Sequence, residues 1–196
     1  MRIAIVSDIH DHISRLATAL ERVRDADALI CCGDLCSPFI MRQLGEGFAG
    51  PIHIVFGNND GDLFRLTATA ARFPAITLHG AFADLDLNGL RVAVTHYPEI
   101  AMPLLESGRY GLVCCGHNHQ YTVVQHGAVT LVNPGEVMGE LYGAATCAVY
   151  DSETGDVTPI TIDDAACLSF RALRFAQGKR SEESERVAHD PSRCSG

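Results

Sequence analysis

Acidic, amide and imidazole side chains follow five short apolar runs of this 196-residue chain, each at the point where the run ends. The runs read AIV, LICC, HIVF, VAVT and LVCC, and such runs are typical of buried strands. The polar residues that follow them are Asp8 and His10, Asp34, Asn58, His96, and His117 and His119. A lone histidine is usually a surface residue and a single Gly-Asp pair is an ordinary turn. The signal is therefore the recurrence at five strand ends.

The carboxyl ends of strands in an open α/β sheet form the edge at which ligands bind. In an extended chain residues i and i+2 point the same way, so the D-x-H and H-x-H pairs can each offer two ligands to one site. Glycine precedes Asp34, Asn58 and His117, which lets the chain turn sharply off each strand. The sequence thus predicts that the seven side chains converge.

Seven ligands with only two carboxylates are too many for one ion and suit two divalent ions that share a carboxylate. Imidazole, carboxylate and amide ligands without thiolate favour Mn²⁺, Fe, Co²⁺, Ni²⁺ or Zn²⁺ over Ca²⁺ and Mg²⁺. We expect two ions. The residues alone leave the metal open among these five, and Mn²⁺ is taken as the first candidate.

The run CCGHNH could instead suggest a zinc knuckle. Cys114 and Cys115 are neighbours in a strand and point to opposite faces, so both cannot reach one metal. The same holds for Cys31 and Cys32. We expect reduced cysteines that pack the interior.

Strand and helix alternate in the first half of the chain, with helices predicted at residues 14–24, 38–47 and 62–72. The second half reads as mostly antiparallel strand, with a helix at 99–108 and hairpin turns at Asn88-Gly89, His126-Gly127 and near Thr154-Gly155. One domain is expected over 1–165. Residues 166–196 are polar and are expected to form a mobile tail, or alternatively a short partner-binding helix.

The net charge of −9 argues against long nucleic acids as partners, because phosphate backbones need clustered Lys and Arg. A small phosphorylated molecule remains compatible, since a local metal cluster outweighs the global charge. No apolar run approaches the roughly 20 residues of a membrane span. The start of the chain lacks the features of a signal peptide, so a cytoplasmic location is expected.

The motifs SDIHDH, CCGDL, GNNDG, VTHY, CGHNH and VNPGE, in this order, resemble those of the calcineurin-like metallophosphoesterases, in particular the small YfcE-type phosphodiesterases. The likeness runs from about residue 1 to 162. It implies an α/β fold of the four-layer α/β/β/α sandwich type, and in some small relatives self-association. It also implies one ion held by Asp8, His10, Asp34 and His119, and another held by Asp34, Asn58, His96 and His117.

The resemblance implies hydrolysis of a small phosphodiester by a hydroxide that bridges the two ions. Many relatives have histidine where this chain has Asn59, which can bind phosphate but cannot deliver a proton. We therefore expect a preference for good leaving groups, or a diester whose leaving oxygen is protonated by water or by another residue. His12 is the candidate for that residue and, with Asn59, for substrate contact. Asn59 and Asp60 are the catalytic candidates, and Asp60 is expected to orient the metal ligands rather than to bind metal itself. VNPGE is expected to form a turn that borders the site, and no chemistry is assigned to it. A phosphomonoesterase and a non-catalytic scaffold, like the retromer subunit of this fold, are the alternatives.

Overall fold

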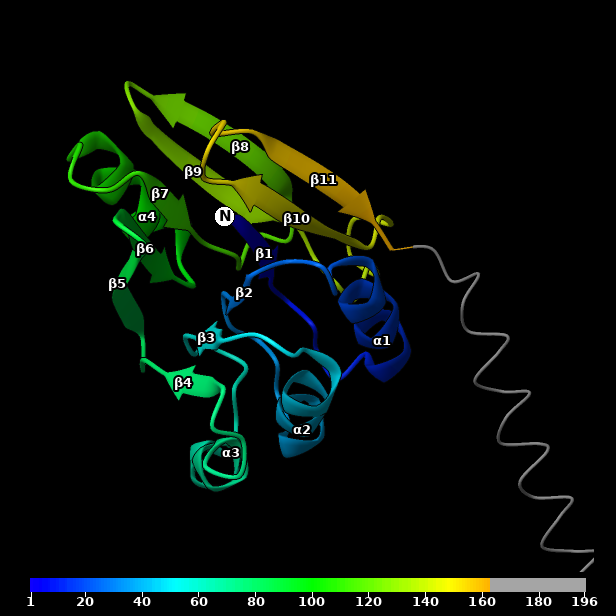
Figure 1. Cartoon of the computed structure of the whole chain (residues 1–196). Helices are drawn as coiled ribbons and strands as arrows, with labels where there is room; N and C mark the ends of the chain where they lie inside the picture. The colour runs from blue at the N-terminus through cyan, green and yellow to red at the C-terminus, as the bar shows by residue number, and fades with distance from the viewer. Residues whose placement is uncertain (163–196) are drawn as a thin grey trace, which may run out of the picture. The chain divides into compact units, whose positions relative to one another are not determined.

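The computed structural model describes residues 1–162, which contain two mixed β-sheets and four helices. The first sheet has the order β11-β10-β1-β2-β3-β4 (Figure 1). Its strands are β1 (Arg2–Val6), β2 (Ala28–Cys31), β3 (Ile52–Ile54), β4 (Ile76–Leu78), β10 (Thr146–Asp151) and β11 (Val157–Thr161). Strands β1 to β4 pair in parallel, whereas β10 and β11 add antiparallel strands beside β1.

The second sheet has the order β5-β6-β7-β9-β8. Its strands are β5 (Phe82–Leu87), β6 (Leu90–Thr95), β7 (Leu112–Cys114), β8 (Tyr121–His126) and β9 (Val129–Pro134). The three central strands pair in parallel, and both edge strands join through antiparallel hairpins. The β5–β6 turn confirms the sequence prediction, because Asn88 and Gly89 both have the positive φ that a type I′ turn requires.

The four helices begin and end within two residues of their predicted bounds. They are α1 (Ile13–Arg22), α2 (Pro38–Gly47), α3 (Leu63–Ala70) and α4 (Pro98–Glu106). Side chains cap two of them: His12 Nδ1 accepts from the Arg15 amide at 3.4 Å, and Asp62 Oδ1 accepts from the Arg65 amide at 3.0 Å. Helix α4 contains Pro103 and still forms, with Ala101 and Leu105 buried against the second sheet.

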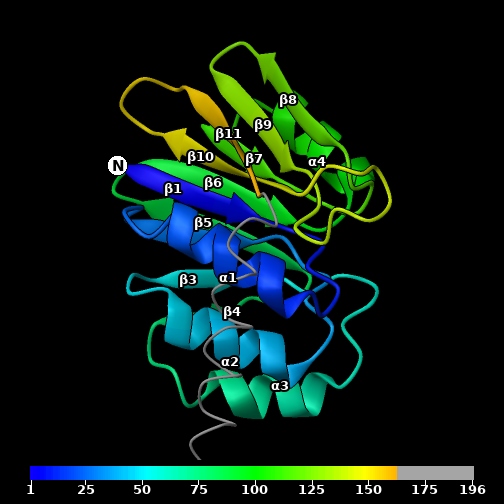
Figure 2. The ribbon, with the colours of Figure 1, turned by 90° about the vertical axis from the view of Figure 1, so that its right-hand side faces the viewer.

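Three clusters of buried apolar side chains lie between the layers of residues 1–162 and pack them together. Helices α1 to α3 pack on one face of the first sheet, through residues such as Leu16, Leu44 and Leu66. The other face of that sheet packs against the second sheet, where Ile5 and Val92 belong to one cluster. Helix α4 covers the far face of the second sheet. Figures 1 and 2 show α4 on the side opposite α1 to α3, which accords with the expected α/β/β/α order.

The structure corrects the sequence prediction in two places. Strand β4 was not expected, because three half-exposed residues carry too little pattern. The second half is less antiparallel than predicted, since β6, β7 and β9 pair in parallel. Strands β10 and β11 form the hairpin predicted near Thr154-Gly155, and β10 pairs with β1 at the edge of the first sheet, a position for which the sequence made no prediction.

The predicted tail at 166–196 lies outside the described residues. Among residues 1–162, no helix combines the length and apolar character needed to cross a bilayer.

Candidate metal centre

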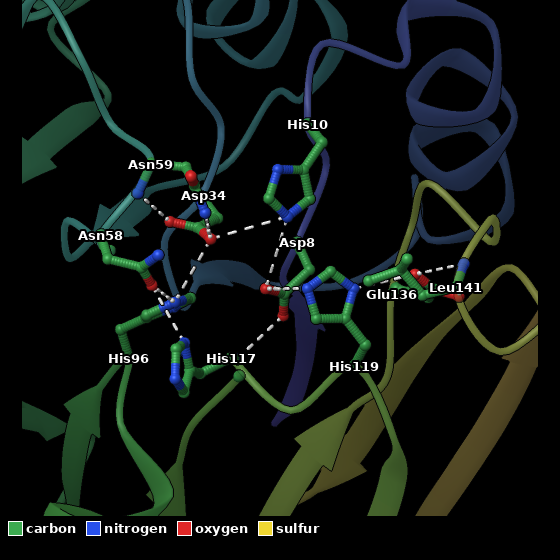
Figure 3. Close-up of polar contacts among 12 residues, drawn as sticks. Asp8, His10, Asp34, Asn58, Asn59, His96, His117, His119, Glu136 and Leu141 are labelled. Atoms are coloured by element: carbon green, nitrogen blue, oxygen red, sulfur yellow. Dashed lines mark hydrogen bonds and ion pairs between the residues drawn. The ribbon is translucent and has the colours of Figure 1, made fainter.

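All seven predicted ligands lie in loops that follow the carboxyl ends of parallel strands. Asp8 and His10 follow β1, Asp34 follows β2 and Asn58 follows β3. His96 directly follows β6, and the remaining two histidines follow β7. Figure 3 shows these loops facing one another, so that the two sheets contribute side chains to one cluster.

The backbone at the cluster is not extended, which corrects one premise of the sequence analysis. Asp8, His10, His117 and His119 all have positive φ, from 43° to 71°. Left-handed backbone is costly for residues with a Cβ and gathers at functional sites. The ligands converge because the chain turns sharply at each one, and the i, i+2 alternation of a strand does not apply.

Two glycines make room for this crowding. Gly33 has φ of +100°, and a Cβ there would lie 2.6 Å from the Gly57 nitrogen. Gly116 has ordinary backbone, but a Cβ there would overlap the Ser7 hydroxyl and lie 2.7 Å from Asp8 Oδ2. Side chains at these two positions would push the loops apart, so the glycines permit the close approach of the two sheets' loops.

One group of donors consists of Asp8, His10 and His119, whose ligand atoms lie within 4.8 Å of one another. Asp8 Oδ1 is 3.4 Å from His119 Nε2 and 3.8 Å from His10 Nε2. Asp8 Oδ1 and His10 Nε2 are both buried and have no hydrogen-bond partner among the described residues. Buried polar atoms are nearly always paired, so this arrangement suits a cation bound between them.

A second group of donors lies on the other side of Asp34. Asp34 Oδ2 is 3.5 Å from His10 Nε2 and also 3.5 Å from His96 Nε2, the position expected of a bridging carboxylate. Asn58 Oδ1 lies 3.1 Å from His96 Nε2 and 2.9 Å from His117 Nδ1. Asp8 also comes within 4.8 Å of the Asp34 and His96 ligand atoms, so both carboxylates border both groups.

Three of the imidazoles are held at Nδ1 and present Nε2 to the cluster. His96 Nδ1 donates to the Cys32 carbonyl at 2.7 Å. His119 Nδ1 donates to Glu136 Oε2 at 2.8 Å, and His10 Nδ1 lies 3.6 Å from Cys36 Sγ. An outer partner at one ring nitrogen fixes the tautomer in which the other nitrogen can bind metal.

The electrostatics of the cluster follow from the proximity of acids and imidazoles. Burial opposes ionisation of Asp34, but His96 and Asn59 outweigh it and hold the pKa of Asp34 well below its usual value. The contact with Asp8 raises the pKa of His10. Burial works to lower the pKa of His96, yet Asp34 prevails and raises it. The site thus stabilises positive charge, as a cation site must.

Asn59 lies beside the bridging carboxylate. Its backbone amide donates to Asp34 Oδ1 at 2.8 Å and its side-chain amide donates to Asp34 Oδ2 at 2.7 Å. The structure therefore gives Asn59 an orienting contact that the sequence did not suggest. The predicted contact of Asn59 with substrate stays a prediction, as does that of His12, which caps α1 and lies 3.8 Å from Glu140.

Asp60 organises the loops that carry the ligands. Its Oδ1 accepts from the Leu35 and Cys36 amides at 2.9 and 2.8 Å. Its Oδ2 accepts from the Asp34 and Gly57 amides at 3.1 and 2.7 Å. One buried carboxylate therefore joins the loop after β2 to the loop after β3, while its role in orienting the ligands for catalysis stays a prediction.

Five of the six cysteines predicted to pack the interior are buried, namely Cys31, Cys32, Cys114, Cys115 and Cys147, and the sixth, Cys167, lies outside the described residues. Cys31 and Cys32 belong to different apolar clusters, and so do Cys114 and Cys115. All six cysteines in the described part of the chain are free.

Glu136 is the residue that the sequence analysis missed. Its side chain is fully buried and contacts His119, although the VNPGE segment was expected to form only a turn. An acidic residue in an otherwise apolar, buried strand end was the one available signal.

The chain matches known proteins over most of its length. Residues 1–155 match the calcineurin-like phosphoesterase superfamily domain. A phosphodiesterase of Methanocaldococcus jannaschii is 29% identical over 167 residues, which cover 83% of this chain and 100% of that protein. The solved structure of an archaeal phosphodiesterase superposes with a TM-score of 0.76 at 28% identity, and the match covers 82% of this chain and 99% of that one.

More distant structures share the fold. The phosphoesterase YfcE of E. coli has a TM-score of 0.56 at 17% identity, over 83% of this chain and 100% of its own. Vps29 of Entamoeba histolytica, in a structure described as a complex with Zn²⁺, has a TM-score of 0.54 at 14% identity, over 83% and 100%. With the family match over residues 1–155, these findings confirm the predicted α/β fold and phosphoesterase class: the chain belongs to the calcineurin-like phosphoesterase superfamily.

Proposed function

We propose that this protein is a metal-dependent phosphodiesterase that hydrolyses a small phosphodiester at a centre of two divalent ions. The observation that carries the proposal is the convergence of two buried carboxylates and four histidines, with Asp34 3.5 Å from an imidazole on either side. The M. jannaschii relative, which is described as a phosphodiesterase, supports the diester as substrate.

The residues fit a pair of ions. One ion would be held by Asp8, His10, Asp34 and His119, and the other by Asp34, Asn58, His96 and His117. The mixed nitrogen and oxygen donors suit Mn²⁺ first, then Fe, Zn²⁺, Ni²⁺ or Co²⁺. When bound, such a pair supplies a hydroxide nucleophile at neutral pH and neutralises charge on the phosphoryl oxygens.

The protein's own part is to position these donors. Asp34 is kept ionised by Asn59 and His96, so it can serve both halves of the centre. The Cys32 carbonyl keeps the His96 Nε2 directed at Asp34. Asn59 has no acidic proton to give, so the departing oxygen must leave as an anion or be protonated by water or by another residue such as His12.

A scaffold function is the competing hypothesis. The Zn²⁺ complex described for Vps29 means that metal binding by itself does not separate the two, so hydrolysis must be measured. The complete donor set of this chain favours catalysis.

The test is hydrolysis of bis-p-nitrophenyl phosphate with added Mn²⁺ by the wild type, Asp34→Asn and His96→Ala. Asp62→Asn serves as the control, because Asp62 is exposed and its contacts, the α3 cap and an ion pair with Arg65, involve none of the proposed ligands. We expect the two site variants to lose at least about 100-fold in kcat and the control to match wild type. Inactivity of the wild type with each of the five metals would favour the scaffold function. If Asp34→Asn and His96→Ala kept wild-type activity, the catalytic site would have to lie elsewhere. The ratio of diester to monoester rates decides between the two esterase classes.

A further inference from the structure

The buried carboxylate of Glu136 links the candidate metal centre to the loop at residues 137–144, in addition to backbone hydrogen bonds from Val137 and Met138 to the Ser7 and Asp8 carbonyls. Glu136 Oε2 accepts from His119 Nδ1 at 2.8 Å, on the side of the ring away from Asp8. Glu136 Oε1 accepts from the Leu141 and Tyr142 amides at 3.0 and 2.8 Å. Figure 3 shows Glu136 between His119 and the Leu141 backbone. The two oxygens of one side chain therefore face two different parts of the molecule.

The 137–144 loop depends on polar anchors for its order. Leu141 and Tyr142 are 64% and 59% exposed, so their side chains bury little apolar surface. The start of the loop is fixed separately, because Val137 is buried in the first apolar cluster and the Val137 and Met138 amides donate to the Ser7 and Asp8 carbonyls. Farther along, Arg15 contacts the Met138 carbonyl and lies 2.9 Å from Glu140 Oε1. Segments with few buried apolar contacts open at low free energy. The bonds to Glu136 therefore contribute a large share of what holds the centre of this loop in place.

We propose that Glu136 is a positioning residue that couples metal occupancy at His119 to the order of the 137–144 loop. The proposal rests on the metal centre proposed above. A metal bound at His119 Nε2 requires the ring proton to be on Nδ1, where it is donated to Glu136. Without metal the ring can also adopt the other tautomer, in which Nδ1 and Glu136 Oε2 are both acceptors and repel each other.

The coupling is reciprocal. If metal at His119 strengthens the hold of Glu136 on the loop amides, then a Glu136 held by those amides strengthens metal binding by the same factor. Outer partners of metal-binding histidines typically contribute about 10- to 100-fold in metal affinity.

The substitution Glu136→Gln separates the two contacts by chemistry. Glutamine offers one acceptor oxygen and one NH₂ group in place of two acceptor oxygens. The glutamine oxygen can accept a hydrogen bond from His119 or from the loop amides. Its NH₂ group must then face the remaining donor, with which it cannot form a hydrogen bond. The matched control is Glu140→Gln, which removes the same charge four residues away and leaves the hydrogen bonds of Glu136 to His119 and to the Leu141 and Tyr142 amides in place.

The first experiment needs no mutation. Hydrogen exchange of the wild type is measured with EDTA and with saturating Mn²⁺, and the 137–144 loop is compared with the β10–β11 turn. We expect exchange at Leu141 and Tyr142 to slow by about tenfold or more with Mn²⁺, while the Gly155 amide in the turn is unchanged. Equal exchange of the loop in both states would overturn the proposal.

The second experiment is calorimetric titration of Mn²⁺ into wild type and both variants. The dissociation constant should rise about 10- to 100-fold in Glu136→Gln and stay within about threefold in Glu140→Gln. Equal affinities in the two variants would overturn the coupling while leaving the metal centre intact. A wild type that binds no Mn²⁺ would overturn the proposed function itself. If Glu136→Gln does not fold, the wild-type exchange experiment decides.

Discussion

The substitution Asp60→Asn tests whether one buried carboxylate holds together the loops that carry the metal ligands. Asp60 is 8% exposed and accepts hydrogen bonds from four backbone amides, two on each carboxylate oxygen. Asparagine keeps one oxygen and places an NH₂ group against the other two amides. Each buried amide without an acceptor costs about 1–3 kcal/mol, so the free energy of unfolding should fall by about 2–6 kcal/mol. That is a large part of the roughly 5–15 kcal/mol typical of a domain.

The assay is urea denaturation in EDTA, so that loss of metal binding does not enter the result. Asp62→Asn is the matched control, because it removes the same charge two residues away and asparagine caps a helix as well as aspartate does. Its free energy of unfolding should stay within about 0.5 kcal/mol of wild type. Equal stability of the two variants would refute the reasoning, since it would mean that the four amides do not depend on Asp60.

Three further predictions follow from individual side chains. Because Asn59 cannot deliver a proton, aryl phosphodiesters should be hydrolysed much faster than alkyl ones; equal rates, with chemistry rate-limiting, would contradict this. Burial and the neighbouring His79, 3.1 Å away, lower the pKa of His53 below 6.5. The stability supplied by this neutral histidine is then full above pH 6.5 and is lost as the pH falls through the folded-state pKa. Between pH 7.5 and 5.5 the free energy of unfolding should therefore fall more in wild type than in His53→Gln. An equal decrease in both proteins would show that folding does not favour the neutral form of His53. Burial, with acidic neighbours such as Asp11, raises the pKa of Cys36 to about 12. Alkylation of Cys36 by iodoacetamide at pH 8 should therefore be at least about tenfold slower than that of free cysteine, and a comparable rate would place the thiol in a more open setting.

The sequence was sufficient to find the seven candidate ligands because each depends on a local rule. A polar residue just after an apolar run lies at the end of a strand, and parallel strands end at a common edge. The helices were predicted for the same reason, since the spacing of Leu16 and Leu20 and the position of Pro38 are local signals.

Glu136 was not predictable in this way. Its partner His119 lies 17 residues earlier, and its loop partners follow it by five and six residues. Nothing in the spacing indicates that one side chain meets both. For a related reason the sequence predicted only a substrate contact for Asn59. Its contact with Asp34 exists only once two loops have been brought together. Pairing of β10 with β1 likewise depends on which sheet edge is open, which is a property of the whole fold.

The central claim is that these loop ends form one site for two cations with Asp34 between them. The most direct measurement is anomalous diffraction from a crystal of the purified protein soaked in Mn²⁺. The account predicts two peaks about 3.5–4 Å apart, one beside His10 and His119 and the other beside Asn58 and His96. A single peak, or peaks away from Asp34, would contradict it.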